Sequence, residues 1–218
     1  MERTDPAYRG QKDYTPFLLG IYDRFVVGFV AGAVWKCPIQ PMVDRYRSLA
    51  GARHLDVGPG TGYFLARSRP ETELTLVDPN PNVLEHCART LAEFRPTLVE
   101  ADVLKPLPVD GPFDSAALSM VLHCLPGPQS AKSRAVKNVA AVLDANGVLF
   151  GSTILGLAEA HPRRARAVLR LFNRQGGFDN AGDTLEGLEA ILRDSFDDVE
   201  ITVTGSAAHF VARGPSGR

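Results

Sequence analysis

The chain has 218 residues, of which 44% are hydrophobic and 22% charged, and its formal net charge is −1. This length suits one globular domain with a core of ordinary size. A nearly neutral chain has no overall attraction to nucleic acid or to an anionic membrane, and we expect neither as a partner.

The cysteines and the first residues predict a cytoplasmic location. Cys37, Cys87 and Cys124 are widely separated and odd in number. This spacing argues against a disulfide framework and against a metal site, so we expect free thiols. Residues 1–20 mix acidic and basic side chains and lack the apolar core of a signal peptide. The longest apolar run, 25–35, is shorter than the ~18 residues that suggest a membrane span.

The first 50 residues predict a helical cover. Five apolar residues repeat there at helical spacing: Phe17, Leu18, Ile21, Phe25 and Val26. Pro38 and Pro41 interrupt the pattern, and a second helix is expected from about residue 42 to residue 49. We expect residues 1–50 to cover a single domain at 51–213, which a flexible tail at 214–218 follows.

From residue 51 onward, strands and helices alternate. Strands are predicted at residues 53–57, 74–77, 97–100, 113–122, 148–154, 199–204 and 207–213. Helices are predicted near Tyr63 and at residues 81–94, 131–143, 162–173 and 184–196, with Asn146-Gly147 as a left-handed stop. A short turn at Gly205-Ser206 should pair the last two strands antiparallel. The alternation predicts an α/β, Rossmann-like, mostly parallel sheet with helices on both faces.

A glycine-rich loop follows the first predicted strand, with glycines at positions 58, 60 and 62. A dinucleotide-binding motif needs its third glycine one place later, where Tyr63 stands, and Asp56 would lie close to a pyrophosphate. Glycines let the backbone approach a ligand closely, and a carboxylate suits the ammonium and sulfonium groups of S-adenosylmethionine. For the loop alone, a tight strand-to-helix turn without a ligand stays open.

Acidic residues end the next two strands. Asp78 ends the second strand and could accept hydrogen bonds from both ribose hydroxyls, although a turn residue in Asp78-Pro79-Asn80 is the alternative. Asp102 follows the third strand and could accept the adenine amino group while Val103 packs against the ring, although a turn cap explains Asp102 alone equally well. The carboxyl end of the fourth strand, near Ser119, should face the methyl group.

With these residues in order, the sequence resembles the class I S-adenosylmethionine-dependent methyltransferases, and its N-terminal segment is similar to that of small-molecule, natural-product enzymes in bacteria and fungi. The segment His54 to Gly62 resembles the first motif of the family, Asp78 its ribose ligand and Asp102-Val103 its adenine-side pair. The resemblance implies seven strands in the order 3-2-1-4-5-7-6, the last one antiparallel. It also implies cofactor contacts from Gly58, Pro59, Gly60, Gly62, Pro79, Asn80 and Ser119. In related proteins an N-terminal helix closes over the cofactor and a tyrosine there often touches it, which indicates Tyr14 or Tyr22.

His123 is the candidate general base. It follows the fourth strand, where the acceptor should lie, and an unperturbed pKa of ~6.5 suits proton transfer. Related enzymes often have a structural histidine here, so that alternative stays open. Arg163, Arg166, Arg170 and Arg174 share one helix face, which could meet an anionic acceptor or RNA, although a solvated face is the simpler interpretation.

The leading prediction is methyl transfer by direct displacement from S-adenosylmethionine to oxygen, nitrogen or carbon of a small molecule, a secondary metabolite, with S-adenosylhomocysteine as product. No aspartate set of the magnesium-binding kind is visible, so we expect metal-free transfer. A homodimer is compatible with the sequence. The alternatives are a non-catalytic S-adenosylmethionine-binding partner subunit, an RNA methyltransferase, and a nicotinamide oxidoreductase, which would lack its Tyr-x-x-x-Lys pair.

Overall fold

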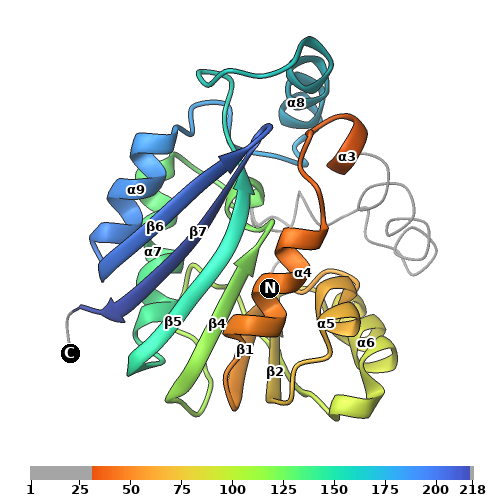
Figure 1. Ribbon diagram of the computed structural model, residues 1–218, viewed down its shortest axis with the longest axis vertical. Coiled ribbons are helices and arrows are strands. Elements are labelled where there is room, and N and C mark those ends of the chain that lie inside the picture. The colour runs from red at the N-terminus through yellow and green to blue at the C-terminus, as the bar shows by residue number, and fades with distance from the viewer. Residues whose placement is uncertain (1–30, 217–218) are drawn as a thin grey trace.

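The computed structural model describes residues 31–216, which form one seven-stranded sheet with the order β3-β2-β1-β4-β5-β7-β6 (Figure 1). The strands are β1 (Arg53–Val57), β2 (Glu73–Asp78), β3 (Thr97–Glu100), β4 (Phe113–Ser119), β5 (Leu143–Ile154), β6 (Phe196–Thr204) and β7 (Ala207–Pro215). The pairs from β3 to β5 are parallel, and β7 runs antiparallel to both of its neighbours. The expected strand order and the antiparallel last strand are therefore confirmed.

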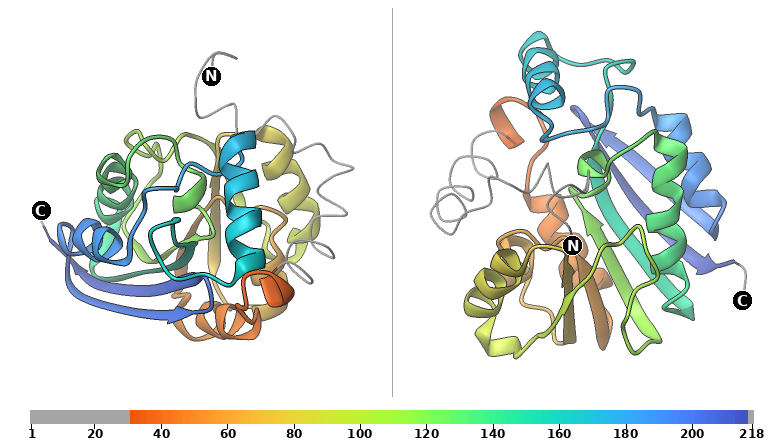
Figure 2. Two further views of the ribbon diagram at one scale, coloured as in Figure 1. Left: turned by 90° about the horizontal axis from the view of Figure 1, so that it is seen from above. Right: turned by 180° about the vertical axis from the view of Figure 1, so that it is seen from behind.

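Helices cover both faces of the sheet (Figure 2). They are α3 (Ala31–Ala33), α4 (Gln40–Leu49), α5 (Tyr63–Ser68), α6 (Pro81–Thr90), α7 (Gln129–Ala140), α8 (Arg163–Gln175) and α9 (Leu185–Arg193), with short 3-10 turns η2 (Ala92–Phe94) and η3 (Leu122–Cys124). The helices α7 and α9 pack on one face, α4, α5 and α6 on the other, and α8 lies beyond the carboxyl ends of the strands. Among the residues described, no helix is both long and apolar enough to cross a membrane.

The alternation of side chains along β1 positions the polar residues of the site. Leu55 and Val57 point toward α7 and α9 and join the larger core cluster. His54 and Asp56 point to the opposite face, where the ring of Tyr46 from α4 packs edge-on against His54. The first strand therefore buries a carboxyl group on the side of the sheet that α4 covers.

The tip of the last hairpin is fastened to the segment that follows α3. The Ser206 N–H donates to the carbonyl oxygen of Trp35 at 2.8 Å. Gly205, with φ of +61°, lies so close to the Trp35 carbonyl that a Cβ would overlap it. The hairpin turn and the cover thus share one contact, which requires a glycine at position 205.

Two predicted boundaries near β4 and β5 are wrong. The helix α7 ends at Ala140, and Asn146-Gly147 lies inside β5, at an irregular start where the register with β4 shifts. Neither residue has a positive φ, so neither is a left-handed helix stop. The fourth strand ends at Ser119 because Met120 takes a φ of +62° and turns the chain into η3.

Residues 214–216 differ from the expectation of a flexible tail at 214–218, of which residues 217–218 lie outside the described part of the chain. The last strand continues to Pro215, which pairs with Phe196 of β6. The Ser216 N–H then donates to the Ser195 carbonyl oxygen at 2.8 Å. Pairing with β6 therefore orders Pro215, although the Gly, Pro and Ser residues of this segment suggested a flexible tail.

The close contact at Gly151 in β5 gives a test of the core. A Cβ there would overlap the Leu118 carbonyl oxygen and lie 2.7 Å from the Phe210 ring. Gly151→Ala should lower the free energy of unfolding by ~1–3 kcal/mol, because the core has no room for a methyl group. Gly182→Ala, where nothing lies within 4 Å, is the matched control and should change it by less than ~0.5 kcal/mol. Urea unfolding of both variants measures this, and equal midpoints would contradict the packing.

Candidate active site

The three glycines of the loop after β1 all have left-handed backbone, with φ of +66° at Gly58, +58° at Gly60 and +77° at Gly62. A Cβ at Gly58 would lie 2.6 Å from Val121, and one at Gly62 would lie 3.0 Å from Leu91. At Gly60 no atom of residues 31–216 would lie within 4 Å of a Cβ. Two glycines therefore serve the packing of the protein itself, whereas the backbone at Gly60 borders open space that a ligand can approach. Pro59 supports the turn by accepting the Gly62 N–H at 2.9 Å.

Asp56 is a buried carboxyl group with one oxygen left over. It is 2% exposed, and the Tyr46 hydroxyl donates to its Oδ2 at 3.1 Å. Its Oδ1 is buried and has no hydrogen-bond partner among the described residues. Burial raises the pKa of Asp56 to about 8, against the opposing effect of the Tyr46 hydrogen bond. Such an oxygen suits a cationic hydrogen-bond donor supplied by a ligand.

Tyr46 is a functional candidate that the sequence analysis missed. Its ring packs against Phe64 and Phe150, and the nearby Ser119 side chain opposes the rise that burial causes in the pKa of its hydroxyl. It therefore connects α4 to the ends of both β1 and β4. The resemblance indicated such a tyrosine at Tyr14 or Tyr22, which lie outside the described residues. The available signal was its place on the apolar face of the predicted helix, with Met42 and Val43.

Asp78 ends β2 with a second buried carboxyl group. Its Oδ1 accepts the Asn80 N–H at 2.8 Å, and it is 8% exposed. Burial raises its pKa to about 7, against this hydrogen bond. Asn80 in turn caps α6, because its side chain accepts the Asn82 N–H at 3.0 Å. The turn role weighed for Asp78-Pro79-Asn80 is thus present, and the contact of Asp78 with the ribose stays a prediction.

The residues after β3 are divided between a cavity and the core. A cavity of about 290 Å³ is lined by Pro79, Glu100, Ala101, Asp102, Lys105, Pro106 and Pro108. Asp102 Oδ1 accepts the Leu104 N–H at 2.9 Å, so it also forms a turn. Val103, in contrast, is 5% exposed and belongs to the core cluster under α7 and α9. Asp102 therefore lines the cavity, whereas Val103 packs in the core.

His123 in η3 is fixed by the end of β5. The Ile154 N–H donates to its Nδ1 at 3.3 Å, and the Thr153 hydroxyl lies 3.3 Å from the same atom. Burial, together with the nearby charge of Lys132, lowers the pKa of His123 to about 3. The imidazole is therefore neutral at physiological pH, with its proton on Nε2. Its carbonyl oxygen accepts the Asp179 N–H at 2.9 Å.

Aromatic side chains form a wall beyond the end of β4. The ring of Phe178 lies edge-on to His123 with centroids 4.3 Å apart, and it stacks on Phe172 and Trp35. The segment that carries Phe178 is held by Lys132, whose Nζ donates to Asp183 at 2.6 Å and to the Asp179 carbonyl at 2.7 Å. The buried ammonium group thus holds the turn that places Phe178 against His123.

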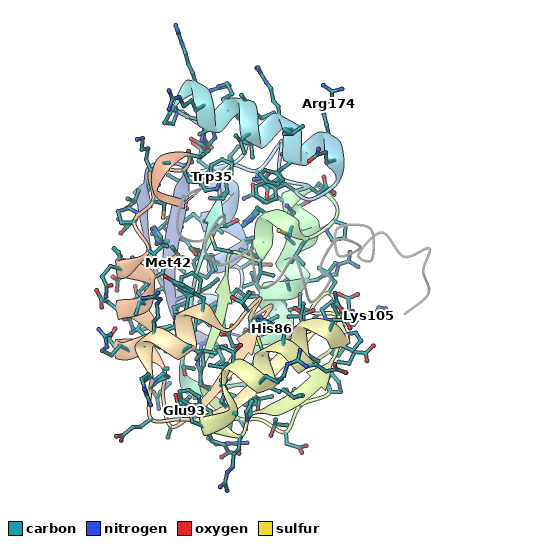
Figure 3. All side chains as sticks on the ribbon, turned by 90° about the vertical axis from the view of Figure 1, so that its right-hand side faces the viewer. Trp35, Met42, His86, Glu93, Lys105 and Arg174 are labelled. Atoms are coloured by element: carbon teal, nitrogen blue, oxygen red, sulfur yellow. The ribbon has the colours of Figure 1, made fainter. Side chains whose placement is uncertain are left out.

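The arginine face predicted for α8 is only partly free. Arg166 donates to the carbonyl oxygens of Leu157 and Glu159. Arg163, Arg170 and Arg174 are exposed, and Figure 3 shows Arg174 projecting away from the body of the molecule. This geometry fits a solvated helix face with one structural arginine.

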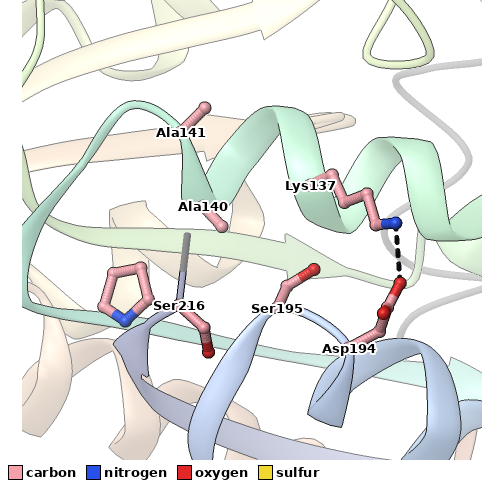
Figure 4. A pocket seen from close by; sticks show the side chains of 7 residues that line it. Lys137, Ala140, Ala141, Asp194, Ser195 and Ser216 are labelled. Carbon is pink, nitrogen blue, oxygen red and sulfur yellow. Dashed lines mark ion pairs between the residues drawn. The ribbon is translucent and has the colours of Figure 1, made fainter. Parts of the chain in front are cut away.

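A second cavity lies at the opposite edge of the sheet (Figure 4). It measures about 230 Å³ and is lined by Lys137, Ala140, Ala141, Asp194, Ser195, Pro215 and Ser216. An ion pair of 2.7 Å between Lys137 and Asp194 crosses it. None of the residues predicted for the cofactor borders this cavity, so the two sites are separate.

The raised pKa values of Asp56 and Asp78 predict how stability depends on pH. The folded protein holds protons that the unfolded chain releases near the ordinary value of 3.8. Stability without ligand should therefore fall as pH rises from about 4 to about 8, by at most ~1.4 kcal/mol per pH unit for each proton. Asp56→Asn should flatten this dependence of stability on pH in urea unfolding. Asp144→Asn, at the amino end of β5, should not. An unchanged slope in Asp56→Asn would contradict the shift.

Comparison with known proteins agrees with this geometry. A family model described as a methyltransferase domain matches residues 55–149. Demethylluteothin O-methyltransferase from Streptomyces thioluteus is 38% identical over 90% of this chain and 87% of its own length. The physcion biosynthesis cluster O-methyltransferase from Aspergillus chevalieri is 34% identical over 99% of both chains.

Solved structures show the same fold. The N-methyltransferase NodS from Bradyrhizobium japonicum, in complex with S-adenosyl-L-homocysteine, has a TM-score of 0.61 at 17% identity over 81% of this chain and 85% of its own. An O-methyltransferase family protein from Burkholderia thailandensis has a TM-score of 0.69 at 18% identity over all of this chain and 65% of its own. The chain belongs to the methyltransferase family. As the sequence predicted, it is a class I enzyme that uses S-adenosylmethionine and acts on small molecules.

Proposed function

We propose that the protein transfers the methyl group of S-adenosylmethionine to a hydroxyl oxygen of a small secondary metabolite. The observation that carries the proposal is the buried Oδ1 of Asp56, which has no hydrogen-bond partner among the described residues and lies, like Asp78, at the carboxyl end of a parallel strand. The choice of oxygen rests on the two relatives described above, which are both named O-methyltransferases.

Each strand end has a proposed part in holding the cofactor. Asp56 Oδ1 would accept a hydrogen bond from the ammonium group, and the Gly60 backbone would lie against the ligand. Asp78 would accept from the ribose hydroxyls, as carboxylates do at this place in dinucleotide-binding sheets. Asp102, with Pro79 in the adjoining cavity, would face the adenine. The cofactor supplies a methyl group that its sulfonium has already activated.

The protein's own work is to align the acceptor and to exclude water. Ser119, at the end of β4, and the wall formed by Phe178, Phe172, Trp35 and His123 border the space for the acceptor. A rigid wall of rings can hold a flat acceptor in one orientation. Such alignment can contribute ~7–11 kcal/mol to lowering the barrier, so no charged catalytic group is needed for most of the acceleration.

The location, the partner and the oligomeric state expected for the protein are part of the same proposal. We place the enzyme in the cytoplasm, because Cys37 and Cys124 form no disulfide within residues 31–216. A free small molecule rather than nucleic acid is the proposed partner, since a chain of net charge −1 has no overall attraction to nucleic acid. A homodimer is compatible with this function. The relatives' names favour an enzyme over a non-catalytic cofactor-binding subunit.

The proposed role of Asp56 predicts that cofactor binding depends on pH. A carboxylate attracts an ammonium group only when it is ionised, and the pKa of Asp56 without ligand is about 8. The affinity for S-adenosylhomocysteine should therefore rise from pH 6 toward pH 8.5. In Asp56→Asn this rise should be reduced to the part that Asp78 contributes. Calorimetry at several pH values measures it, and identical pH profiles for both proteins would refute the role.

The proposed role of Asp78 gives a direct test of cofactor use. Asp78→Ala should weaken S-adenosylhomocysteine binding by roughly 10- to 100-fold, because a pair of charge-assisted hydrogen bonds is lost. Asp144→Ala is a matched control: Asp144 also accepts the N–H two residues onward, at 3.1 Å, but at the start of β5. Calorimetry should show ordinary affinity for the control. Equal affinity in Asp78→Ala, or no binding by the unaltered protein at high micromolar ligand, would defeat the proposal.

A further inference from the structure

We propose that Cys87 is a positioning residue for the cofactor, because its thiol holds the Gly60 peptide in the orientation against which S-adenosylmethionine binds. The inference rests on the contact proposed above between the Gly60 backbone and the cofactor. In this arrangement Cys87 does not touch the ligand and acts through the backbone of the glycine loop.

The thiol reaches the loop from α6, 27 positions further along the chain. Cys87 is fully buried, and its Sγ donates to the Gly60 carbonyl oxygen at 3.1 Å. The Sγ of Cys37, by comparison, lies 3.9 Å from the carbonyl oxygen of Pro38. Within residues 31–216, no main-chain amide donates to the Gly60 carbonyl oxygen, so the thiol is its donor there.

Gly60 differs from Gly62 in what holds it. A Cβ at Gly62 would lie 3.0 Å from Leu91 and 3.5 Å from Cys87, so α6 packs closely against that residue. Gly60 has no such packing among the described residues, and its φ is +58°. Glycine adopts positive and negative φ with similar ease, so the residue itself does not select this orientation. The hydrogen bond from Cys87 supplies the selection.

The helix that carries Cys87 also begins at the proposed ribose site. Asp78 accepts the Asn80 N–H, and the Asn80 side chain caps α6. Cys87 follows about two turns later on the buried face of the helix, with Val83 and Leu84. One helix therefore connects the carboxyl group proposed for the ribose with the loop that is proposed to lie against the ligand.

A preformed loop favours binding for a physical reason. A loop that already has its bound conformation binds more tightly, because binding does not have to order it. The competing explanation is that Cys87 only fills the core, since cysteine packs as a small hydrophobic residue. The two explanations differ in what a change at Cys87 alters. The first predicts a change in cofactor affinity, and the second predicts a change in stability alone.

The experiment compares three variants by calorimetry with S-adenosylhomocysteine and by urea unfolding. Cys87→Ala removes the donor, whereas Cys87→Ser keeps a hydroxyl donor on a side chain of similar size. Cys37→Ala is the matched control, because Cys37 is also buried and its thiol contacts His209 instead of the glycine loop.

We expect Cys87→Ala to weaken S-adenosylhomocysteine binding roughly 2- to 10-fold, as for the loss of one hydrogen bond. Cys87→Ser should recover most of this loss, and Cys37→Ala should bind like the unaltered protein. Ordinary affinity in Cys87→Ala together with lower stability would overturn the inference and leave a core-filling role. Equal losses in Cys87→Ala and Cys87→Ser would overturn it as well, because the donor would then not matter.

Amide hydrogen exchange of the protein without ligand gives a second readout. In Cys87→Ala, exchange in a peptide that covers residues 60–62 should be faster than in the unaltered protein. The increase should exceed any increase in β4, which reports on the stability of the core. An equal increase in both segments would indicate general destabilisation and contradict the inference.

Failure of this inference can be told apart from failure of the proposed function. If Asp78→Ala weakens binding as expected and Cys87→Ala binds normally, only the role of Cys87 is lost. Equal affinity in Asp78→Ala would defeat the proposed cofactor contacts and this inference with them. Neither measurement depends on the identity of the methyl acceptor.

Discussion

The buried carboxyl group of Asp56 is the constraint on which the candidate site depends. Placing a carboxylate in the middle of a sheet, beneath aromatic rings, disfavours its charged form, and this is why its pKa rises to about 8. The Tyr46 hydroxyl donates to Oδ2, whereas Oδ1 has no donor among the described residues. A cationic ligand group is the natural partner for that oxygen. A buried acceptor without a donor costs free energy, and a ligand that donates to it recovers this cost on binding.

Tyr46 links this buried carboxyl group to the N-terminal cover, because its hydroxyl donates to Asp56 from α4. Its ring joins α4 to Phe64 and Phe150, while its hydroxyl reaches Asp56 and Ser119. The cofactor side and the acceptor side of the edge are therefore joined through one phenol. On the acceptor side, Lys132 has a comparable structural role, because a single buried ammonium holds the turn that presents Phe178 to His123.

Much of the fold and part of the site could be predicted from the sequence, for local physical reasons. Strand and helix periods and the glycines of the loop are short-range signals, and they correctly placed Asp56, Asp78 and Asp102 at strand ends. What failed depends on pairing between distant segments. The register shift that takes Asn146-Gly147 into β5 and the ladder that orders Pro215 are set by neighbouring strands.

The site chemistry was harder to predict for the same reason. The role of Tyr46 requires knowing that α4 crosses β1, and the tautomer of His123 requires knowing that the end of β5 lies beside η3. An unperturbed histidine pKa made His123 look like a base, whereas burial and the Ile154 amide give it a different character. The cofactor contacts proposed for Tyr14 and Tyr22 stay predictions.

The fastening of the hairpin tip to the Trp35 carbonyl has a consequence for protein engineering. Gly205 and Ser206 contact the backbone of the cover directly, although 170 positions separate Trp35 from Gly205. A change in the backbone of one segment therefore requires a matching change in the other. A chimera that borrows the N-terminal segment of a relative to change acceptor preference would need to borrow the matching hairpin tip as well. Libraries that diversify the two segments together should retain more folded members than libraries that diversify either one alone.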